Sequence, residues 1–339
     1  MNTPSKLIPI QTRAKPRTDK PKGFVTPEAA QRHAELLANR VKKRFRHLSR
    51  HFKRETIDCF RLYDWDILEV RAVIDWVAGH IVVGEYVRLQ TPPEWLPRMA
   101  AAVAGALGLP PERVHLRSRR TKTDQRPRYE KAAAKGERIV VRERDLSFWV
   151  NLDDFLDTGL YSDHRDTRVI IRKLAAGQDF LNLYAYSGAF TCAAAAGGAK
   201  TTVTVDRSAT NLAWARDNLA LNKLSGPRHS FVQSDVDKYL EEARRQGKRF
   251  TLALVDPPSF FKDELRGVSF DINADHPFLL SQVLKVMARG GTVIFSTNHQ
   301  RFEPRFEGLP VKDLVELTPA TIPEDYRNRK IHRCWKMKT

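Results

Sequence analysis

The second half of the sequence repeats one pattern: a short apolar run followed by a segment with helical spacing. The runs lie at residues 180–184, 202–205, 230–232, 252–255 and 292–295. Parallel strands that helices cover on both faces are almost continuously apolar, whereas strands with one wet face alternate. The pattern therefore predicts an α/β fold with a parallel sheet. Ligands of such sheets bind beyond the carboxyl ends of the strands.

Positive charge is concentrated in two short stretches of the chain. Residues 1–54 hold 15 Lys/Arg against 3 Asp/Glu, and residues 117–144 hold 11 against 4. These stretches account for the whole net charge of +18, so the second half is nearly neutral. Localised basic patches are typical of proteins that bind a phosphate backbone. A charged tail that serves only solubility is the alternative, and it explains one patch better than two.

Four segments are expected along the chain. Residues 1–26 are rich in proline and basic residues and predict a disordered basic arm. Residues 27–56 predict a basic amphipathic helix, because Leu37, Val41, Phe45, Leu48 and Phe52 form one apolar stripe. Alternating strands and an Ala-rich helix at 95–107 predict a small α+β RNA-binding or accessory module over residues 57–150, with an exposed basic loop from Arg119 to Tyr129. Residues 151–339 form the predicted catalytic domain.

Composition also excludes several classes of protein. The three cysteines, Cys59, Cys192 and Cys334, are too few and too widely spaced for a disulfide framework or a Cys-based zinc site. Apolar runs are too short to span a bilayer, and the N-terminal region is Lys/Pro-rich, unlike a signal peptide. We expect a cytoplasmic protein with no membrane partner and no metal.

The segment Asp256-Pro257-Pro258-Ser259-Phe260 directly follows a predicted strand. Its prolines stiffen the loop. Asp256 and the Pro257 carbonyl can accept hydrogen bonds from a planar nitrogen-bearing ring, on which Phe260 can stack. An ordinary proline turn is the structural alternative. The segment predicts a base-binding slot.

The other strand ends suggest a nucleoside-containing cofactor. The first strand leads through Tyr184, Tyr186, Ser187 and Gly188 into a helix, and later strands end near Asp206 and Asp235. A dinucleotide and S-adenosylmethionine compete as ligands. The glycine-rich pyrophosphate loop is absent, and carboxylates at the strand ends would repel phosphates. A cationic sulfonium is the better electrostatic match, although each Asp could also serve only as a helix cap.

A longer series of motifs resembles one family. The segments are FRLYD at 60–64, DTGLYSDHR at 157–165, NLYAYSG at 182–188, DPPSF at 256–260 and RNRKIHRCW at 327–335. From about residue 38 onward, the sequence resembles the C-terminal half of bifunctional bacterial 23S rRNA guanine methyltransferases, the half that forms N7-methylguanosine. The resemblance implies a class I, Rossmann-like methyltransferase fold, S-adenosylmethionine as cofactor and 23S rRNA as substrate, before or during large-subunit assembly. The N2-modifying half of that family lacks a counterpart here, and the basic arm is expected to take its place.

The resemblance extends to individual positions. Asp256, Pro257 and Phe260 are the expected catalytic group. The expected cofactor-binding residues lie in or after the predicted strands or before the first of them: Asp163, Arg165, Asn182, Tyr184, Tyr186, Ser187, Gly188, Asp206, Arg207, Ser208, Asp235 and Val236. Arg165 is expected to pair with the cofactor carboxylate, with a structural Arg–Asp pair as the alternative.

Three functions stay open at this point. Guanine N7 carries a lone pair and no proton, so N7 methylation requires orientation without a general base. An N2-directed or other amino-directed nucleic-acid methyltransferase is the second possibility, and a non-catalytic RNA-binding assembly factor is the third. Related cytosine-C5 enzymes need a cysteine after the fifth strand, where this sequence has Ser296-Thr297-Asn298.

Overall fold

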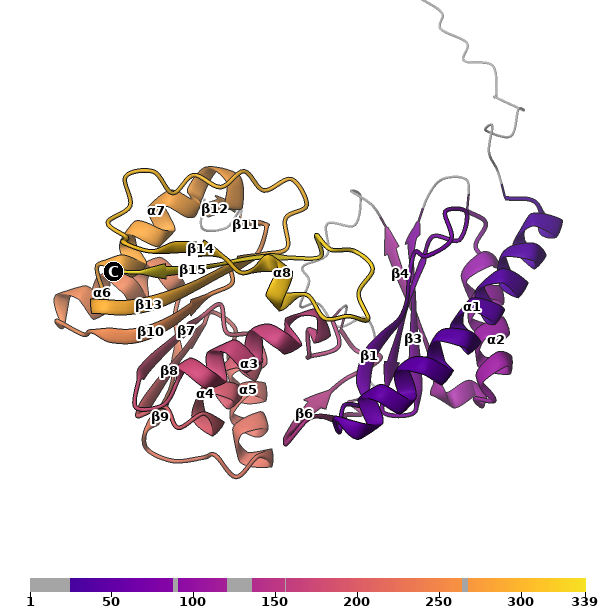
Figure 1. Ribbon diagram of the computed structural model, residues 1–339, viewed down its shortest axis with the longest axis horizontal. Helices are drawn as coiled ribbons and strands as arrows, with labels where there is room; N and C mark the ends of the chain where they lie inside the picture. Colours follow the sequence, from indigo (N-terminus) through magenta and orange to yellow (C-terminus); the bar gives the residue numbers. More distant parts are fainter. Residues whose placement is uncertain (1–24, 88–90, 121–135, 156, 264–267) are drawn as a thin grey trace, which may run out of the picture.

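The computed structural model describes residues 25–87, 91–120, 136–155, 157–263 and 268–339, and its chain forms two halves (Figure 1). The basic arm lies almost wholly outside the described residues, as does the basic stretch at 121–135. Arg119 and Arg120 are described, and they end strand β4 (Val114–Arg120) instead of opening an exposed loop. This part of the loop prediction was wrong, because β4 continues its pairing with β3 (His80–Val87) up to Arg120.

The N-terminal half is a four-stranded sheet with two helices packed against it. Its helices are α1 (Pro27–Arg54) and α2 (Trp95–Leu107), followed by the short η1 (Pro111–Arg113). The strand order is β1-β2-β3-β4, with β1 at Cys59–Asp64 and β2 at Ala72–Val77. The predicted apolar stripe faces the sheet, since Leu37, Val41, Leu48 and Phe52 are buried in one cluster with residues of both β1 and α2.

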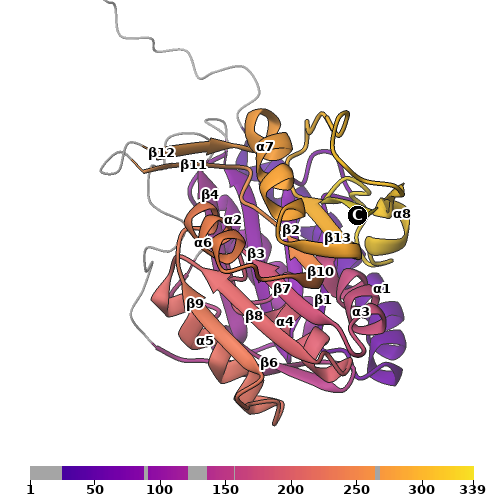
Figure 2. The ribbon, with the colours of Figure 1, turned by 90° about the vertical axis from the view of Figure 1, so that its left-hand side faces the viewer.

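The C-terminal half is built on a seven-stranded sheet with the order β14-β15-β13-β10-β7-β8-β9 (Figure 2). Five neighbouring strands are parallel: β7 (Asp179–Leu183), β8 (Thr201–Asp206), β9 (His229–Gln233), β10 (Phe250–Val255) and β13 (Met287–Thr297). Strand β15 (Arg333–Lys338) is antiparallel to β13 and to β14 (Leu314–Glu316). All five predicted strand runs are present, and the α/β, Rossmann-like fold is confirmed.

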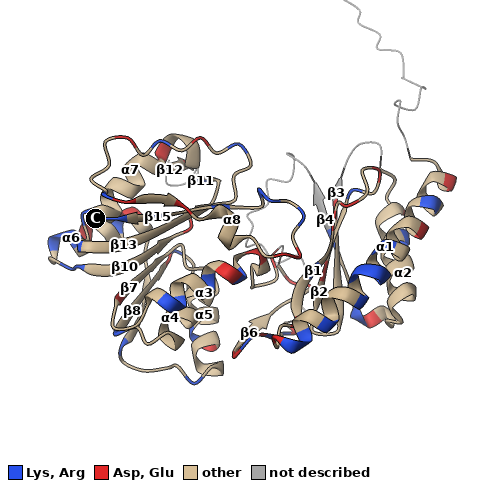
Figure 3. Ribbon diagram, viewed as in Figure 1, with Lys and Arg blue, Asp and Glu red and all other residues tan. Residues whose placement is uncertain are grey.

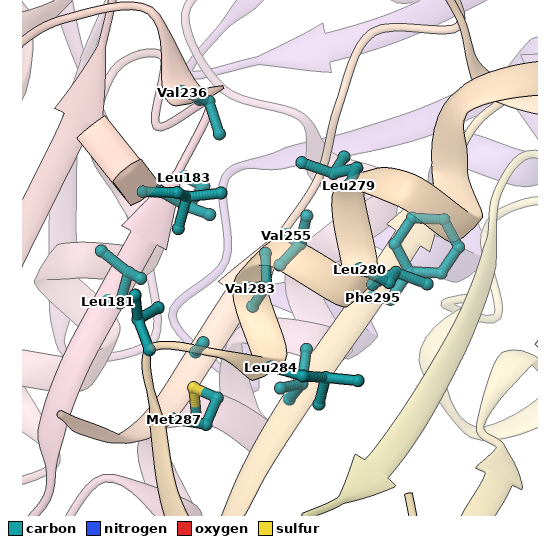
Figure 4. Packing of buried hydrophobic residues seen from close by; sticks show 14 of the residues in the cluster. Leu181, Leu183, Val236, Val255, Leu279, Leu280, Val283, Leu284, Met287 and Phe295 are labelled. Atoms are coloured by element: carbon teal, nitrogen blue, oxygen red, sulfur yellow. The ribbon is translucent and has the colours of Figure 1, made fainter. Parts of the chain in front are cut away.

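Helices cover both faces of this sheet. Their bounds are η2 (Ser162–His164), α3 (Arg165–Leu174), α4 (Ala189–Ala196), α5 (Ala209–Leu221), α6 (Val236–Arg245), α7 (Ile272–Leu284) and α8 (Thr318–Thr321). Neighbouring residues of one strand point to opposite faces. Leu181 and Leu183 pack with α6 and α7 (Figure 4), whereas Phe180 packs with α3 and α4. This two-sided burial explains the continuous apolar runs.

Two hairpins complete the structure. β5 (Ile139–Glu143) pairs with β6 (Leu146–Val150), and β11 (Phe260–Asp263) pairs with β12 (Val268–Asp271). Val141 and Phe148 of the first hairpin share a buried cluster with Cys59 of the N-terminal half and with Cys192 of α4. The β5–β6 hairpin therefore packs against both halves. Among the described residues, no helix is both long and apolar enough to cross a membrane.

Candidate active site

The carboxyl ends of the parallel strands bring the candidate residues together. Register pairs join Leu183 to Val205 on one side and to Val255 on the other, and Val255 also lies beside Phe295. The loops after β7, β8, β10 and β13 therefore start at the same level. Because the chain passes from β9 back across the sheet to β10, the gap between the β7 and β10 loops is a topological switch point, where such folds bind ligands.

The loop after β7 is held in an unusual backbone conformation. Tyr184 and Tyr186 have φ angles of 55° and 49°, in the left-handed region that costs a non-glycine residue of order 1–3 kcal/mol. Ser187 Oγ donates to the Gly159 carbonyl at 2.5 Å, and Asn218 Nδ2 donates to the Ser187 carbonyl at 2.8 Å. The strained loop is fixed by specific hydrogen bonds, as is typical of ligand-binding turns.

Gly188 ends that loop where α4 begins. Its φ is 71°, and a Cβ atom there would lie 2.5 Å from the Ala215 Cβ atom of α5. No larger residue fits without moving a helix. The sequence motif Ser187-Gly188 thus reflects both backbone conformation and the close packing of α4 on α5.

Asp206, the last residue of β8, accepts hydrogen bonds from three neighbouring residues. Its Oδ2 accepts from the Tyr186 amide at 2.9 Å, and its Oδ1 accepts from the Ser208 amide at 2.8 Å and from Asn211 Nδ2 at 3.1 Å. Burial raises the pKa of Asp206, although these hydrogen bonds oppose the shift. The carboxylate ties the β7 loop to the start of α5, and Ser208 caps that helix through the Asn211 amide. Arg207 is exposed and its guanidinium lies over the Phe261 ring.

Acidic residues after β9 lie close to Tyr184 of the β7 loop. Asp235 precedes α6, whose first residue, Val236, is buried beside Leu183 (Figure 4). Burial raises the pKa of Asp237, and the like charges of Asp235 and Asp275 raise it further. The same carboxylates act on the hydroxyl of Tyr184, whose pKa is raised mainly by burial. Such a negative field fits a cationic ligand and disfavours a pyrophosphate.

The base-binding candidate, Asp256–Phe260, follows β10. Asp256 Oδ1 accepts a short hydrogen bond from the hydroxyl of Ser296 in β13, and its Oδ2 lies 3.7 Å from His164 Nε2. Pro257 is buried, and Ser259 Oγ donates to Asn298 Oδ1 at 2.6 Å. Beyond these anchors the Phe260 ring is 61% exposed. The loop combines a fixed carboxylate with an open aromatic face.

Two of the expected cofactor-binding residues, Arg165 and Asn182, bind other residues of the chain. The guanidinium of Arg165 is buried, 2.5 Å from Asp325 Oδ1 and over the Phe52 ring, so the structural Arg–Asp pair describes it. The Asn182 side chain is 1% exposed and donates to Thr191 Oγ1 at 2.9 Å beneath the β7 loop. The Arg165 guanidinium is buried in this ion pair, and the Asn182 side chain is buried with its Oδ1 lacking a hydrogen-bond partner in the described part of the chain. Direct contact of either residue with the cofactor stays a prediction.

A cluster that the sequence analysis missed lies next to Asp256. Asp163 Oδ2 lies 3.0 Å from His332 Nδ1, and the ring of His332 stacks on that of His164 with centroids 4.1 Å apart. Ligand atoms of these three residues lie within 4.8 Å of one another, the spacing of a possible metal site. The motifs DHR and IHR contained these residues, but nothing in the sequence indicated that positions 164 and 332 meet.

The last loop of the chain joins the two halves beside this cluster. Asp325 Oδ2 accepts from the Arg61 amide at 2.8 Å while its Oδ1 binds Arg165, and the Asn328 amide donates to Asp64 Oδ2 at 2.7 Å. Tyr326 lies under the Arg61 guanidinium, which also binds Asp75. In Figure 1 the carboxyl edge of the sheet accordingly faces the N-terminal half.

Comparisons with known proteins agree with this architecture. Ribosomal RNA large subunit methyltransferase K of Neisseria meningitidis is 39% identical over 341 residues, which cover 98% of this chain and 91% of that protein. The crystal structure of SMU.776, described as a methyltransferase complexed with SAH, matches with a TM-score of 0.72 and 22% identity, covering 91% of this chain and 82% of that one. A SAM-dependent methyltransferase from Agrobacterium tumefaciens matches with a TM-score of 0.57 and 16% identity, covering 83% and 90%.

The family described as S-adenosylmethionine-dependent methyltransferase matches residues 61–312, a range that contains the loops after β7, β8, β9, β10 and β13. S-adenosylmethionine is the cofactor of this family, and the carboxylates at the strand ends fit its sulfonium charge. The chain belongs to the S-adenosylmethionine-dependent methyltransferases.

Proposed function

We propose that this protein transfers a methyl group from S-adenosylmethionine to N7 of a guanine in 23S rRNA, before or during large-subunit assembly. The observation that carries the proposal is the loop after β10. Asp256 is anchored by Ser296 yet its side chain remains 25% exposed, and Phe260, four residues later in the same loop, is exposed and available for stacking. The Neisseria relative bears the name of a large-subunit rRNA methyltransferase, which supports the same substrate class.

The cofactor supplies an electrophilic methyl group on a positively charged sulfur. The residues of this chain orient the acceptor. Asp256 accepts hydrogen bonds from donors on the guanine edge, the Pro257 carbonyl accepts another, and Phe260 stacks on the ring. Guanine N7 needs no base to remove a proton, so orientation by a stiff loop is the main requirement. Asp163, Tyr184, Tyr186, Ser187, Gly188, Asp206, Arg207, Ser208, Asp235 and Val236 would hold the cofactor.

The cysteines support a reaction without a covalent enzyme–base intermediate. Cys59, Cys192 and Cys334 are all buried, and burial raises the pKa of each thiol. Cys334 pairs with Ser296 across β15 and β13, with its side chain fully buried. No cysteine of the chain can therefore supply the exposed thiolate that C5 methylation of a pyrimidine requires.

Helix α1 offers a surface for the RNA backbone. Lys42, Lys43, Arg46, Arg50, Lys53 and Arg54 are exposed on the side of α1 that faces away from the core. Figure 3 shows these charges along the helix. Arg44 is different, because it donates to the carbonyls of Leu62 and Asp325 and so contributes to the junction of the two halves. Phosphate contacts on α1 would offset the cost of unstacking the target base.

The product of the reaction tests this proposal. Ribosomal RNA from a bacterial strain that lacks the corresponding methyltransferase is incubated with the protein and labelled S-adenosylmethionine, and the nucleosides are separated by mass spectrometry. We expect label in 7-methylguanosine. Label in an N2-methylated or other amino-methylated base would replace the N7 proposal with the amino-directed alternative. No transfer, together with retained RNA binding, would favour a non-catalytic assembly factor.

A further inference from the structure

The β11–β12 hairpin places two neighbouring phenylalanines on opposite faces. Side chains alternate along a strand, so Phe260 and Phe261 point away from each other. Phe260 is exposed, whereas Phe261 is half-buried and packs against the cluster that contains Leu183 and Val236. In Figure 1 the hairpin lies beside α7. The contacts that hold Phe261 therefore also set the orientation of Phe260, the ring that stacks on the substrate base in the proposed function.

A short stack of side chains holds Phe261 in place. Phe270 lies directly opposite it in the register of the hairpin, and the two rings are stacked at 11° with centroids 5.7 Å apart. Phe270 is 8% exposed, and its centroid lies 6.4 Å from that of the Tyr184 ring in the β7 loop. The guanidinium carbon of Arg207 lies 5.1 Å from the centroid of the Phe261 ring. We call Tyr184, Phe270, Phe261 and Arg207 the aromatic bridge.

Both ends of the aromatic bridge belong to the expected cofactor site. Tyr184 directly follows β7, and Arg207 directly follows β8. The same two loops are joined by the hydrogen bond from the Tyr186 amide to Asp206. The bridge thus connects the hairpin to two loops that are already tied together. A cofactor held by these loops would contact Tyr184 and Arg207, the two end residues of the bridge.

Phe260 is flanked by two anchored residues. The amide of Ile272, a fully buried residue that begins α7, donates to the Ser259 carbonyl at 3.1 Å. On its other side, Phe260 is followed directly by Phe261 of the aromatic bridge. A change in how firmly the bridge is held therefore reaches Phe260 across a single peptide unit.

A bound cofactor would strengthen the contacts of the aromatic bridge. Arg207 is exposed, and a guanidinium over a ring is only weakly attracted in water but more strongly attracted once a ligand excludes the water. The rings of Tyr184 and Phe270 are tilted at 40°, with a separation near the long end of the range for aromatic pairs. Both contacts can therefore gain from a ligand that covers them, and such a gain favours the hairpin position that the bridge maintains.

We propose that Phe261 and Phe270 are positioning residues that couple the cofactor site to Phe260. When the cofactor is bound, the aromatic bridge holds the Phe260 ring in the orientation that stacks on the substrate base. The protein then binds its RNA more tightly with the cofactor or S-adenosylhomocysteine in place, and RNA tightens cofactor binding by the same factor. The role of Phe260 rests on the proposed function, but the coupling does not depend on which atom of the base is methylated.

Equilibrium dialysis of the full-length protein with tritiated S-adenosylhomocysteine measures this coupling. The dissociation constant is determined without RNA and with saturating unmodified 23S rRNA made by transcription in vitro. For the wild type we expect RNA to tighten binding about tenfold, within the usual range for coupled sites. Phe261→Leu keeps an apolar side chain but removes the ring, so the factor should fall below about twofold, while the affinity without RNA changes less than about threefold.

Two variants control for the loss of a ring. Phe231 of β9 is also half-buried, and the guanidinium carbon of Arg216 lies 4.8 Å from its ring centroid, but it is not part of the bridge. Phe231→Leu should keep the full coupling, as should Phe261→Tyr, which retains the ring. If Phe261→Leu does not fold, Arg207→Gln decides, because this exposed side chain can be replaced without disturbing the core, and the coupling factor should again fall.

The outcomes separate this inference from the proposed function. Equal coupling in the wild type and in Phe261→Leu, or methylation of 23S rRNA by a wild type that shows no coupling, would overturn the aromatic bridge alone. Coupling that depends on Phe261, together with methylation at another atom of the base, would refute only the N7 assignment. A 23S rRNA that is neither methylated nor coupled to S-adenosylhomocysteine binding would overturn both.

Discussion

Asp256 has one oxygen bound by Ser296 and the other directed toward His164, and its side chain is still partly exposed. Replacing it by Asn keeps the shape but removes the charge that accepts hydrogen bonds from the base. We expect Asp256→Asn to lower kcat by about 100-fold, the order seen when one aligned catalytic hydrogen-bonding group is lost. RNA affinity should stay within about threefold in a filter-binding assay.

Asp179→Asn is the control for this substitution, because Asp179 starts β7 at the opposite edge of the sheet, where it accepts from Thr201 Oγ1. The control should retain full transfer. Equal losses in the two variants, or normal transfer by Asp256→Asn, would contradict the role assigned to Asp256.

His164 should make stability depend on pH. Its pKa is about 4 in the folded protein because of burial and the neighbouring His332, compared with 6.5 for an ordinary histidine. Between pH 6.5 and 4 the unfolded chain therefore binds a proton that the folded chain does not. The free energy of unfolding should fall by about 1.4 kcal/mol per pH unit in this window as pH decreases, or roughly 3 kcal/mol in all.

Denaturant titrations at several pH values measure this contribution as the difference between the wild type and His164→Gln. The variant should show a flatter dependence on pH than the wild type. Parallel curves for the wild type and His164→Gln would show that His164 titrates alike in both states.

At the level of single residues, the sequence indicated Asp206, Asp235 and Asp256 because each follows an apolar run. It did not indicate Ser296 or His164 as neighbours of Asp256. Ser296 lies beside Asp256 because β13 pairs with β10, and the composition of β13 does not single out its polar residues. The pairing of Arg165 with Asp325 could not be predicted, because Asp325 is far away in the sequence.

Among the loops and helices, Gly188 allows a test of how α4 shapes the cofactor loop. Gly188 and Gly177 both have φ of 71°, but only Gly188 would bring a Cβ atom against Ala215. Gly177→Ala should cost about 1–2 kcal/mol from backbone strain alone. Gly188→Ala should cost roughly 2–5 kcal/mol, because overpacking adds to the strain, and it should weaken S-adenosylmethionine binding.

Thermal unfolding and isothermal titration calorimetry compare these two variants. If both lose the same stability and both bind the cofactor normally, the close packing of α4 on α5 does not shape the site.

Helix α1 should act through its exposed charges. Replacing Arg46 and Arg50 by Ala should reduce the slope of log K against log salt for RNA binding by about 1.5, since each phosphate contact contributes about 0.7–0.9. Folding should be unaffected, because both side chains are exposed. Lys238→Ala/Arg244→Ala on α6, at the other end of the molecule in Figure 1, is the control. An unchanged slope in the α1 variant would remove this helix from the RNA-binding surface.

The elements themselves were largely predictable. The apolar stripe of α1, the alternating strands of the N-terminal half and the Ala-rich helix α2 match their sequence signals, because each has a strong period. The placement of the β5–β6 hairpin was not predictable. Its residues alternate like an ordinary surface hairpin, and only the folded chain shows that Phe148 packs beside Cys192 of α4.

On the scale of the whole molecule, the two halves are joined by buried ionic contacts. Asp325 links Arg61 and Arg165, residues from three segments that are distant in sequence. No local sequence pattern predicts such a junction. In the sequence, its buried charged residues look the same as charged residues on the surface, and only the fold shows their partners. The junction fixes the position of α1 relative to the β10 loop. The proposed RNA-binding surface and the proposed base-binding loop are therefore held at a fixed distance from each other.

The central claim, that the β10 loop presents a guanine of large-subunit rRNA for N7 methylation, is most directly tested by complementation. A strain that lacks this activity is supplied with either the wild-type chain or Asp256→Asn, and 7-methylguanosine is quantified by mass spectrometry in separated 23S and 16S rRNA. The account predicts one additional 7-methylguanosine in 23S rRNA with the wild type and none with the variant. Restoration by Asp256→Asn, or a wild-type product found only in 16S rRNA or only at another atom of the base, would contradict it.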